Sequence, residues 1–202
     1  MPRPKIHDES TKMALLEAGA RVLAREGPAA LTTRRVADEV GASTTAVYTL
    51  FGGKGGLVRE IYIEGFARLA EAFAAVERGH DPVADLRALG LAYRAHGLAN
   101  PHLYELMFGR PVPEFAPATA DVRDTVNSFQ VLVDAVRRCI DQGRFAPADP
   151  SRVALQLWGL VHGLTSLELR GALGPPEQAD EVWDAALANS SRGLAAASEE
   201  GR

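Results

Sequence analysis

Apolar side chains recur every three or four residues along most of the chain, which is the spacing of one face of an α-helix. No segment stands out for alternating apolar and polar positions as a half-buried strand would. The pattern therefore predicts an all-α protein. Helices are expected over residues 10–26, 32–41, 43–51, 56–77, 119–142 and 177–197, and three more are expected to begin at 82, 101 and 150.

Three of these helix starts share one device, a side chain that can cap a helix followed by a proline at the first helical position. They are Asp81-Pro82, Asn100-Pro101 and Asp149-Pro150. Residues 108–117 are rich in proline and are predicted to form an irregular loop. The helix after Pro150 is apolar on nearly every side, which predicts burial over most of its surface.

Residues 31–54 contain two short predicted helices joined by a tight turn at Gly41, which is the layout of a helix-turn-helix. The first helix is capped by Thr32 or Thr33, and the second by Ser43. The side of the second helix that faces away from its apolar residues carries Thr44, Thr45, Tyr48 and Thr49. Short hydroxyl groups and an aromatic ring suit contacts with base edges and phosphates in a major groove. A helical hairpin in any all-α protein would show the same spacing, so the pattern alone leaves both interpretations open.

Positive groups and a helix terminus lie near this hairpin. Thr33 stands at a helix N-terminus, where free N–H groups and the helix dipole favour a phosphate. Lys54 follows the second helix, where a cation can reach the DNA backbone. Arg3 and Lys5 form a short basic arm, for which we favour a solvated tail over a DNA contact.

The balance of charge differs along the chain. Residues 1–54 hold 8 Lys and Arg against 6 Asp and Glu, whereas the rest holds 14 against 20, within a net charge of −4. A mildly basic head on an acidic body fits a head that binds a polyanion. Cys139 is the only cysteine, which fits a reducing cytoplasm. With no expected signal peptide or membrane span, a cytoplasmic protein without a membrane partner is predicted.

The glycines around Lys54 also invite comparison with a phosphate-binding loop. That loop needs a glycine five residues before its Gly-Lys pair and a Ser or Thr after it. Those positions are Tyr48 and Gly55, so we reject a nucleotide site.

Residues 10–65 resemble the DNA-binding head of TetR-family repressors. The matching positions are Gly27, Leu31, Thr33, Val36, Ala37, Gly41, Ser43, Val47, Tyr48, Phe51, Lys54 and Leu57. The resemblance implies phosphate contacts from Thr33, Tyr48 and Lys54. It implies base reading by Thr44, Thr45 and Thr49, with Arg34 near the groove edge and Ser43 at the start of the recognition helix.

One departure from the family pattern lies at the start of the fourth helix. The family usually places an acidic residue after the lysine and a Ser or Asp cap nearby. This chain has glycine at 52, 53, 55 and 56 instead. We therefore expect a looser start to that helix, with a backbone amide in place of the usual cap.

For the rest of the chain, the same resemblance implies a dimer formed by the last two long helices and a small-molecule pocket among the others. The stretch 157–164 also resembles the WHG subclass, through Trp158, His162 and Gly163. Aromatic walls with a few polar tips are typical of ligand pockets. The candidates of this kind are Tyr93, His96, Tyr104, Met107, Phe108, Phe129, Trp158 and His162. Each of them is also a reasonable core residue.

Gly159 and Gly163 lie four residues apart on a strongly apolar helix, so another helix can approach closely there. A dimer seam that includes Leu160 and Leu167 and close packing within one chain are equally consistent with this spacing. The histidines His96, His102 and His162 lack the spacing and the acidic or thiol partners of a metal site, so neither metal nor cofactor is expected.

These observations predict a helix-turn-helix DNA-binding domain over residues 1–56 and a helical ligand-binding and dimerisation domain over residues 57–202. The predicted function is a ligand-responsive bacterial repressor. As a homodimer it would bind a near-palindromic double-stranded operator, with recognition helices about 34 Å apart. An all-α enzyme using His96 or His162 as a base has no nucleophile or carboxylate pair to support it. An interaction module or activator without a ligand is the other alternative.

Overall fold

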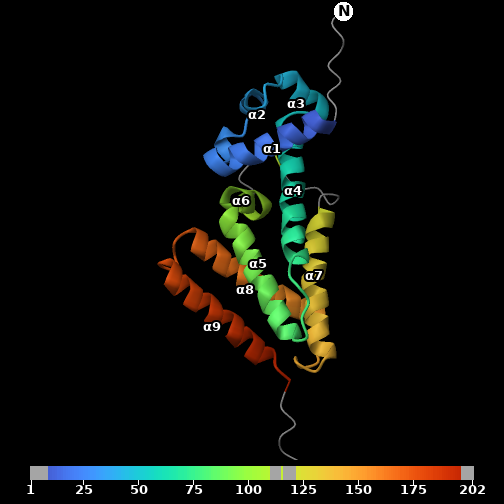
Figure 1. The fold of residues 1–202 in the computed structure, drawn as a ribbon, viewed down its shortest axis with the longest axis vertical. Coiled ribbons are helices and arrows are strands. Elements are labelled where there is room, and N and C mark those ends of the chain that lie inside the picture. The colour runs from blue at the N-terminus through green and yellow to red at the C-terminus, as the bar shows by residue number, and fades with distance from the viewer. Residues whose placement is uncertain (1–8, 110–114, 116–121, 197–202) are drawn as a thin grey trace, which may run out of the picture. The chain divides into compact units, whose positions relative to one another are not determined.

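The computed structural model describes residues 9–109, residue 115 and residues 122–196, apart from the side chains of 122–126. These parts are α-helical, with one short 3-10 turn, and their β pairing consists of an isolated bridge between Phe145 and Ala195. The prediction of an all-α fold is confirmed. The helices are α1 Glu9–Glu26, α2 Thr33–Glu39, α3 Thr44–Phe51, α4 Lys54–Ala74, α5 Pro82–Ala99, α6 Pro101–Gly109, α7 Val122–Asp141, α8 Pro150–Leu169 and α9 Pro176–Leu194, with the 3-10 turn η1 at Pro28–Ala30 (Figure 1).

Local capping explains where several helices begin. The Asp149 carboxylate accepts a hydrogen bond from the Ser151 N–H at 2.9 Å, and the Asp81 carboxylate accepts one from the Val83 N–H at 3.1 Å. Thr32, rather than Thr33, caps α2, because its hydroxyl oxygen accepts the Arg35 N–H at 3.1 Å. The three predicted starts at Pro82, Pro101 and Pro150 all agree with the structure.

Two predicted boundaries are wrong. The fourth helix begins at Lys54 rather than residue 56, because the Gly53 carbonyl already accepts the Leu57 N–H at 3.1 Å. Phe108 belongs to helix α6 rather than to a loop, since its ring packs against Phe66 and Tyr104 at 5.6 and 4.9 Å between ring centroids. Most of the remaining predicted loop lies outside the described residues.

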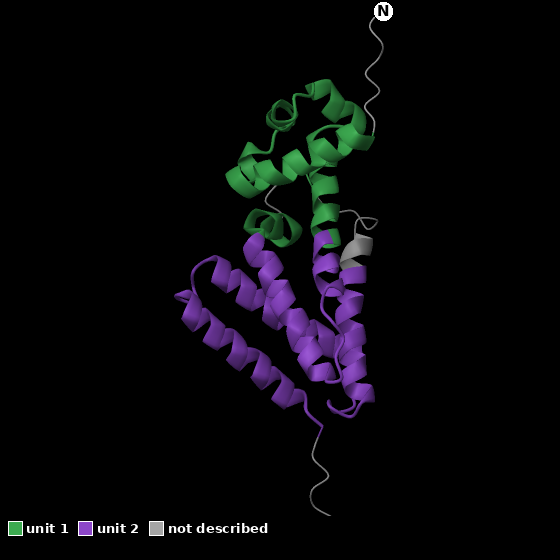
Figure 2. Cartoon of the chain, in the orientation of Figure 1, with its two compact units in different colours: residues 1–67, 100–124 green, residues 68–99, 125–202 purple. Residues whose placement is uncertain are grey.

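The chain divides into two compact units, coloured separately in Figure 2. The first comprises residues 1–67 and 100–124, and the second comprises residues 68–99 and 125–202. The first unit therefore contains α1 to α3, most of α4, and α6, although α5 separates α6 from the others in the chain. The domain boundary after residue 56 stays a prediction.

Two glycines let α4 pack closely within the first unit. A Cβ added to Gly19 on α1 would lie 2.8 Å from Cδ1 of Ile61, and one added to Gly65 would lie 2.8 Å from Sδ of Met107 on α6. Because Leu57, Val58 and Ile61 have no exposed surface, the first turns of α4 form the centre of this unit.

The second unit is built from α5, α7, α8 and α9. Its core lies between α5, α7 and α8 and consists of Leu86, Val133, Val136, Cys139, Phe145, Val153, Ala154 and Leu157. Polar contacts lie at the edge of this core. Asp85 on α5 pairs with Arg138 on α7, and its carboxylate also accepts the Gly79 N–H at 2.9 Å. These hydrogen bonds, the one from Gly79 first, hold the pKa of Asp85 below its ordinary value.

The composition of α8 predicted burial over most of its surface, but the structure leaves part of the helix exposed. Leu155 is 56% exposed and Leu167 is 45% exposed in the single chain. The prediction is wrong because α5, α7 and α9 cover only part of the helix circumference. In the parts of the chain that the structure describes, no helix combines the length and apolarity needed to cross a membrane.

Candidate functional site

Buried apolar side chains hold α2 and α3 together and so fix the arrangement of the helix-turn-helix. Val36 and Ala37 on α2, and Ala46 and Val47 on α3, have no exposed surface. Gly41 turns the chain between the helices with a φ of +65°, which is a left-handed conformation that glycine adopts without strain. With these inner sides buried, the opposite side of α3 faces solvent.

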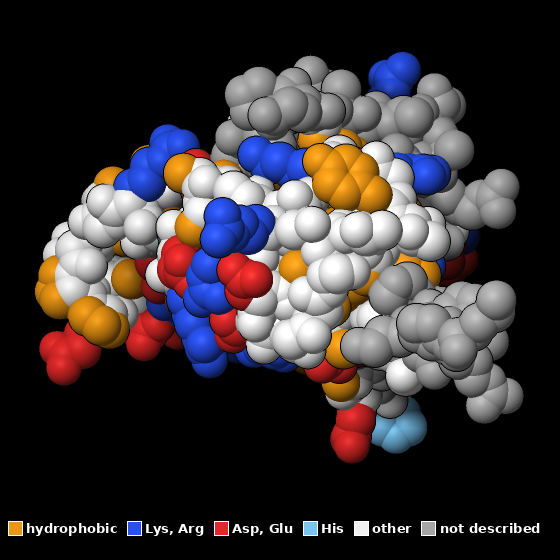
Figure 3. Space-filling view, turned by 90° about the horizontal axis from the view of Figure 1, so that it is seen from above, with side chains coloured by type: hydrophobic (Ala, Val, Ile, Leu, Met, Phe, Trp, Pro, Cys, Tyr) orange, Lys and Arg blue, Asp and Glu red, His pale blue; other side chains and the backbone are white. Residues whose placement is uncertain are grey.

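We call that solvent side of α3 the hydroxyl face, and it consists of Thr44, Thr45, Tyr48 and Thr49, all exposed. Ser43 precedes it as the N-cap of α3, with its hydroxyl oxygen accepting the Ala46 N–H at 3.2 Å. Seen from the α2–α3 end, Lys and Arg side chains lie beside exposed hydrophobic atoms, and some of the acidic side chains lie among other Lys and Arg side chains (Figure 3). An exposed row of hydroxyl groups with cations nearby can contact both base edges and phosphates.

Tyr48 is 60% exposed, and its ring lies over the turn that follows α3. A Cβ added to Gly53 would lie 3.1 Å from Cε1 of the Tyr48 ring, and Gly53 has a φ of +114°. Gly53 therefore serves two purposes, because it turns the chain and leaves room for the tyrosine ring.

The start of α4 is closely packed against the end of α3. A Cβ added to Gly56 would lie 1.6 Å from the carbonyl oxygen of Phe51, which no side chain could tolerate. This contact gives Gly56 a steric role that the sequence pattern did not indicate. The side chain of Lys54, the first residue of α4, is half-buried beside this turn.

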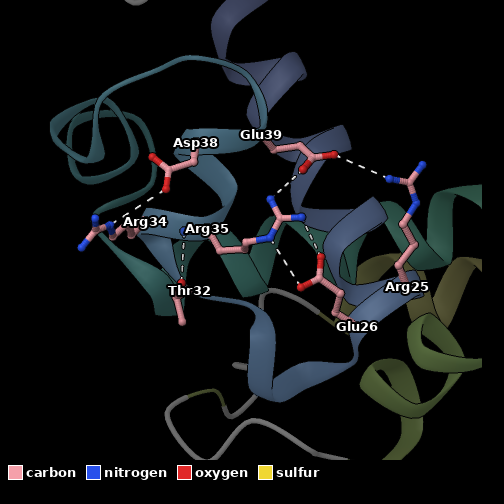
Figure 4. A network of polar contacts seen from close by, with 7 residues as sticks. All are labelled: Arg25, Glu26, Thr32, Arg34, Arg35, Asp38 and Glu39. Atoms are coloured by element: carbon pink, nitrogen blue, oxygen red, sulfur yellow. Dashed lines mark hydrogen bonds and ion pairs between the residues drawn. The ribbon is translucent and has the colours of Figure 1, made fainter.

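Two neighbouring arginines of α2 have different surroundings (Figure 4). The Arg34 side chain is 87% exposed, and its Nε lies 3.9 Å from the Asp38 carboxylate. Arg35 instead bonds to Glu26 at 2.7 Å and to Glu39 at 2.6 Å, which ties α2 to the end of α1. Hydrogen bonding from Arg35 holds the pKa of Glu39 below its ordinary value.

The Arg35 contacts distinguish the two arginines by how much of each side chain solvent can reach. With Arg35 held between two carboxylates, Arg34 is the cation that α2 presents to solvent. Sequence reasoning missed the pairing of Arg35 with Glu26, because residues nine apart in different helices share no local spacing signal.

The predicted effector residues fall into two groups. In the second unit, the Tyr93 hydroxyl lies 2.9 Å from Nδ1 of His162, whose ring lies 5.8 Å from that of Trp158 between centroids. Phe129 meets Trp158 at 6.1 Å, and His96 is buried on the same helix as Tyr93. Burial lowers the pKa of both His96 and His162, so both imidazoles are neutral near pH 7.

The other group lies in the first unit, where Tyr104 and Phe108 join a chain of aromatic rings. The Phe66 ring packs against the Tyr62 ring at 5.1 Å between centroids, and the Tyr62 ring packs against the Phe115 ring at 5.3 Å. Met107 packs against α4 at Gly65. Sequence reasoning missed Tyr62 and Phe66 because they sit at ordinary core positions of their helix.

The predicted dimer residues lie on one exposed side of α8. We call Leu155, Gly159, Gly163 and Leu167 the open face, since they recur every four residues along this helix. A Cβ added to Gly159 or Gly163 would meet nothing within 4 Å among the residues that the structure describes. Close packing within the chain therefore does not explain these glycines. Leu160, at the side of this face, is half-buried.

A second feature that the sequence did not reveal joins α5, α8 and α9. The Arg94 guanidinium bonds to Glu168 at 2.6 and 2.8 Å and lies 2.7 Å from the Asp180 carboxylate. The same Glu168 accepts the indole N–H of Trp183 at 2.7 Å, and Trp183 has no exposed surface. Because these residues lie far apart in the chain, only the packed helices bring them together.

A metal site among the histidines would need several ligating side chains close together. Within residues 9–109, 115 and 122–196, no group of three or more His, Cys, Asp or Glu side chains is arranged to hold a metal ion. His102 contacts Glu105 at 4.0 Å one helical turn away.

Comparison with known proteins relates both halves of the chain to one family. Residues 15–61 match the family model described as bacterial regulatory proteins, tetR family, and residues 86–189 match one described as tetracyclin repressor-like, C-terminal domain. An HTH-type transcriptional regulator of Mycobacterium tuberculosis is 26% identical over 211 residues, covering 88% of this chain and 89% of that protein.

Solved structures agree in fold. A protein of unknown function from Rhodococcus sp. RHA1 superposes with a TM-score of 0.83 at 31% identity, covering 96% of this chain and 100% of that chain. A bacterial regulatory protein in the tetR family from Rhodococcus RHA1 superposes with a TM-score of 0.70 at 19% identity, covering 94% and 100%.

Proposed function

We propose a function from one premise: the chain belongs to the TetR family of bacterial regulatory proteins. It is accordingly a transcription regulator with a helix-turn-helix that binds DNA. Family members bind DNA and small-molecule effectors and form dimers, and they are generally not enzymes. Within that frame we propose a ligand-responsive repressor that binds a near-palindromic operator as a homodimer. Assignment to the WHG subclass stays a prediction.

The hydroxyl face of α3 is the observation that carries the DNA-binding part of the proposal. It is exposed while the other side of the same helix is fully buried, so α3 is held rigidly with this face outward. We propose that Thr44, Thr45 and Thr49 contact bases. Thr33, Tyr48 and Lys54 would contact phosphates, and Arg34 would lie at the groove edge with Ser43 as the cap.

The open face of α8 supports the homodimer. Leu155 and Leu167 are partly exposed on this face, and apolar surface of this kind becomes favourable when another protein covers it. Glycine at 159 and 163 allows a second helix to approach the α8 backbone. Because family members form dimers and most homodimers are symmetric, the same face on a second copy is the partner that we propose.

The effector site is proposed in the second unit, around Tyr93, Trp158 and His162. Support comes from the aromatic rings of Phe129, Trp158 and His162 and from the hydrogen bond between Tyr93 and His162. Neutral imidazoles suit an uncharged ligand with hydrogen-bonding groups. Binding there would release DNA by favouring a state in which the heads are spaced differently.

The DNA-binding proposal is tested with labelled duplexes from the intergenic region beside the gene for this chain. We expect wild-type protein to give a specific shift at moderate salt that unlabelled non-specific DNA does not remove. Tyr48→Ala and Lys54→Ala should each weaken binding roughly tenfold or more. Arg137→Ala, which removes an exposed cation in the second unit, is the matched control.

No specific shift for any such duplex would count against the regulator. Equal loss of binding in Arg137→Ala would show that the phenotype reflects total charge rather than the helix-turn-helix.

The effector proposal is tested by native mass spectrometry of protein purified from its own host. We expect an added small-molecule mass that disappears on denaturation and is reduced in His162→Leu. Protein without any such mass, in which compounds with aromatic rings and hydrogen-bonding groups neither alter tryptophan fluorescence nor release DNA, would favour a filled core instead.

A further inference from the structure

The hydroxyl face of α3 has few hydrogen-bond donors for reading bases. It consists of three threonines and a tyrosine, without the guanidinium or amide side chains that pair with guanine or adenine in two hydrogen bonds. Ser43 beside it acts as the helix cap. Base recognition by this face must therefore rely on single hydrogen bonds or on apolar contacts.

Thr49 is the member whose hydroxyl hydrogen is already used. Its hydroxyl donates to the carbonyl oxygen of Thr45, four residues earlier, at 2.9 Å. This bond is a common arrangement for threonine in a helix, and it selects one χ1 rotamer of the side chain. A threonine hydroxyl has one hydrogen, so the exposed side chain is left with a methyl group and an acceptor oxygen.

Tyr48, the residue before Thr49, also contributes apolar surface to the exposed side of α3. Tyr48 is 60% exposed, and the contact with Gly53 determines where its ring lies. The C-terminal half of the hydroxyl face therefore carries both a threonine methyl group and an aromatic ring.

We infer that Thr49 is a specificity-determining residue that packs its γ-methyl group against the C5-methyl group of a thymine in each half of the operator. In the major groove this methyl group distinguishes thymine from the other three bases, and apolar contact with a threonine methyl group is an established way of reading it. The inference rests on the proposed DNA binding through α3. The competing role for Thr49 is acceptance of a hydrogen bond from an adenine or cytosine amino group.

The test exchanges thymine for deoxyuridine, which keeps the base pairing and removes only the methyl group. Wild-type protein first selects its preferred site from short duplexes of random sequence. Each thymine of that duplex is then replaced in turn, and Kd is measured by fluorescence anisotropy. One buried methyl group corresponds to about a fourfold change in Kd at each half-site.

Two variants separate the methyl group from the hydroxyl group. Thr49→Ser keeps the hydroxyl and removes the methyl group, whereas Thr49→Val keeps a methyl group and removes the hydroxyl. The readout is the ratio of Kd for deoxyuridine to Kd for thymine, which does not depend on each variant's overall affinity. Circular dichroism verifies the fold of both variants.

We expect a ratio of about four at one thymine position of each half-site in wild type, a similar ratio in Thr49→Val, and a ratio near one in Thr49→Ser. A ratio near one at every thymine in wild type would overturn the inference while leaving specific binding, and so the proposed function, intact. A ratio that persists in Thr49→Ser, or that disappears in Thr49→Val, would also overturn it. Failure to select any duplex would overturn the proposed function together with the inference.

Discussion

The outer faces of α3 and α8 are both exposed, but exposure means something different for each. The hydroxyl face of α3 consists of threonines and a tyrosine, whose polar atoms bond to water until DNA replaces it. The open face of α8 exposes about half of Leu155 and of Leu167, and burying the remainder is favourable by about 1 kcal/mol for each side chain. Exposure of the hydroxyl face to water therefore costs little free energy when DNA is absent. Exposure of the open face is unfavourable, which favours a lasting contact with another protein.

Glycines on the two sides of the molecule differ in the same way. Gly56 is required within the chain, because an added Cβ would collide with the carbonyl oxygen of Phe51 at 1.6 Å. Among the described residues, nothing lies within 4 Å of a Cβ added to Gly159, so packing there does not require glycine. Packing within the chain thus explains Gly56, whereas neither packing among the described residues nor a left-handed conformation explains Gly159.

The largest effect is expected from Gly56→Ala. The added methyl group must push α4 away from the end of α3, which should lower the free energy of unfolding by roughly 3 kcal/mol or more and abolish DNA binding. Gly159→Ala is the control for folding, since alanine favours a helix over glycine by up to about 1 kcal/mol. Urea denaturation of both variants, at protein concentrations that keep the wild type monomeric, is the measurement. Equal destabilisation of the two would contradict the distinction between crowded and open glycines.

The next effect concerns the dimer. Leu155→Glu combined with Leu167→Glu places charges on the open face, and it should weaken self-association by about a hundredfold or more. Sedimentation velocity over a range of concentrations provides the measurement. Leu98→Glu is the matched control, because Leu98 is a 39% exposed leucine on α5. A double variant that stays as dimeric as wild type would show that another surface joins the copies.

A third prediction compares the two arginine networks. Arg94→Met removes one partner of a nearly buried pair in which Arg94 and Glu168 are 14% and 13% exposed, and it should lower the free energy of unfolding by about 2 kcal/mol. Arg35→Met should have a smaller effect, because the Arg35 side chain is 39% exposed and water screens its pairs. Urea midpoints compare the two variants. An Arg35→Met variant that is the less stable of the two would reverse this order.

The smallest expected effect separates Arg34 from Arg35 on DNA. If Arg34 contacts a phosphate, Arg34→Ala should reduce the slope of log Kd against log salt by about one unit. Arg35→Ala should leave the slope nearly unchanged, because its charge is already paired with Glu26 and Glu39. Anisotropy titrations at several salt concentrations measure both slopes. A larger change for Arg35→Ala would mean that the network opens when DNA binds.

Much of the local structure could be predicted from the sequence because its causes are local. The caps at Ser43 and Asp149 bond to backbone groups two or three residues away, and Gly41 needs only its own conformational freedom to end α2. The helix-turn-helix and its exposed threonines follow from the same short-range spacing. Family resemblance then added the assignment of those positions to DNA, which remains to be tested residue by residue.

Tertiary structure decided what depends on residues distant in the chain. Arg94 meets Glu168 only because α5 packs on α8, and Arg35 meets Glu26 only because α2 folds back on α1. Aromatic candidates that looked equivalent in sequence fall into two compact units, since helical spacing states which residues share a face but not what covers that face. For the same reason the sequence could identify α8 as apolar, while only the packed helices showed that one of its faces is left open.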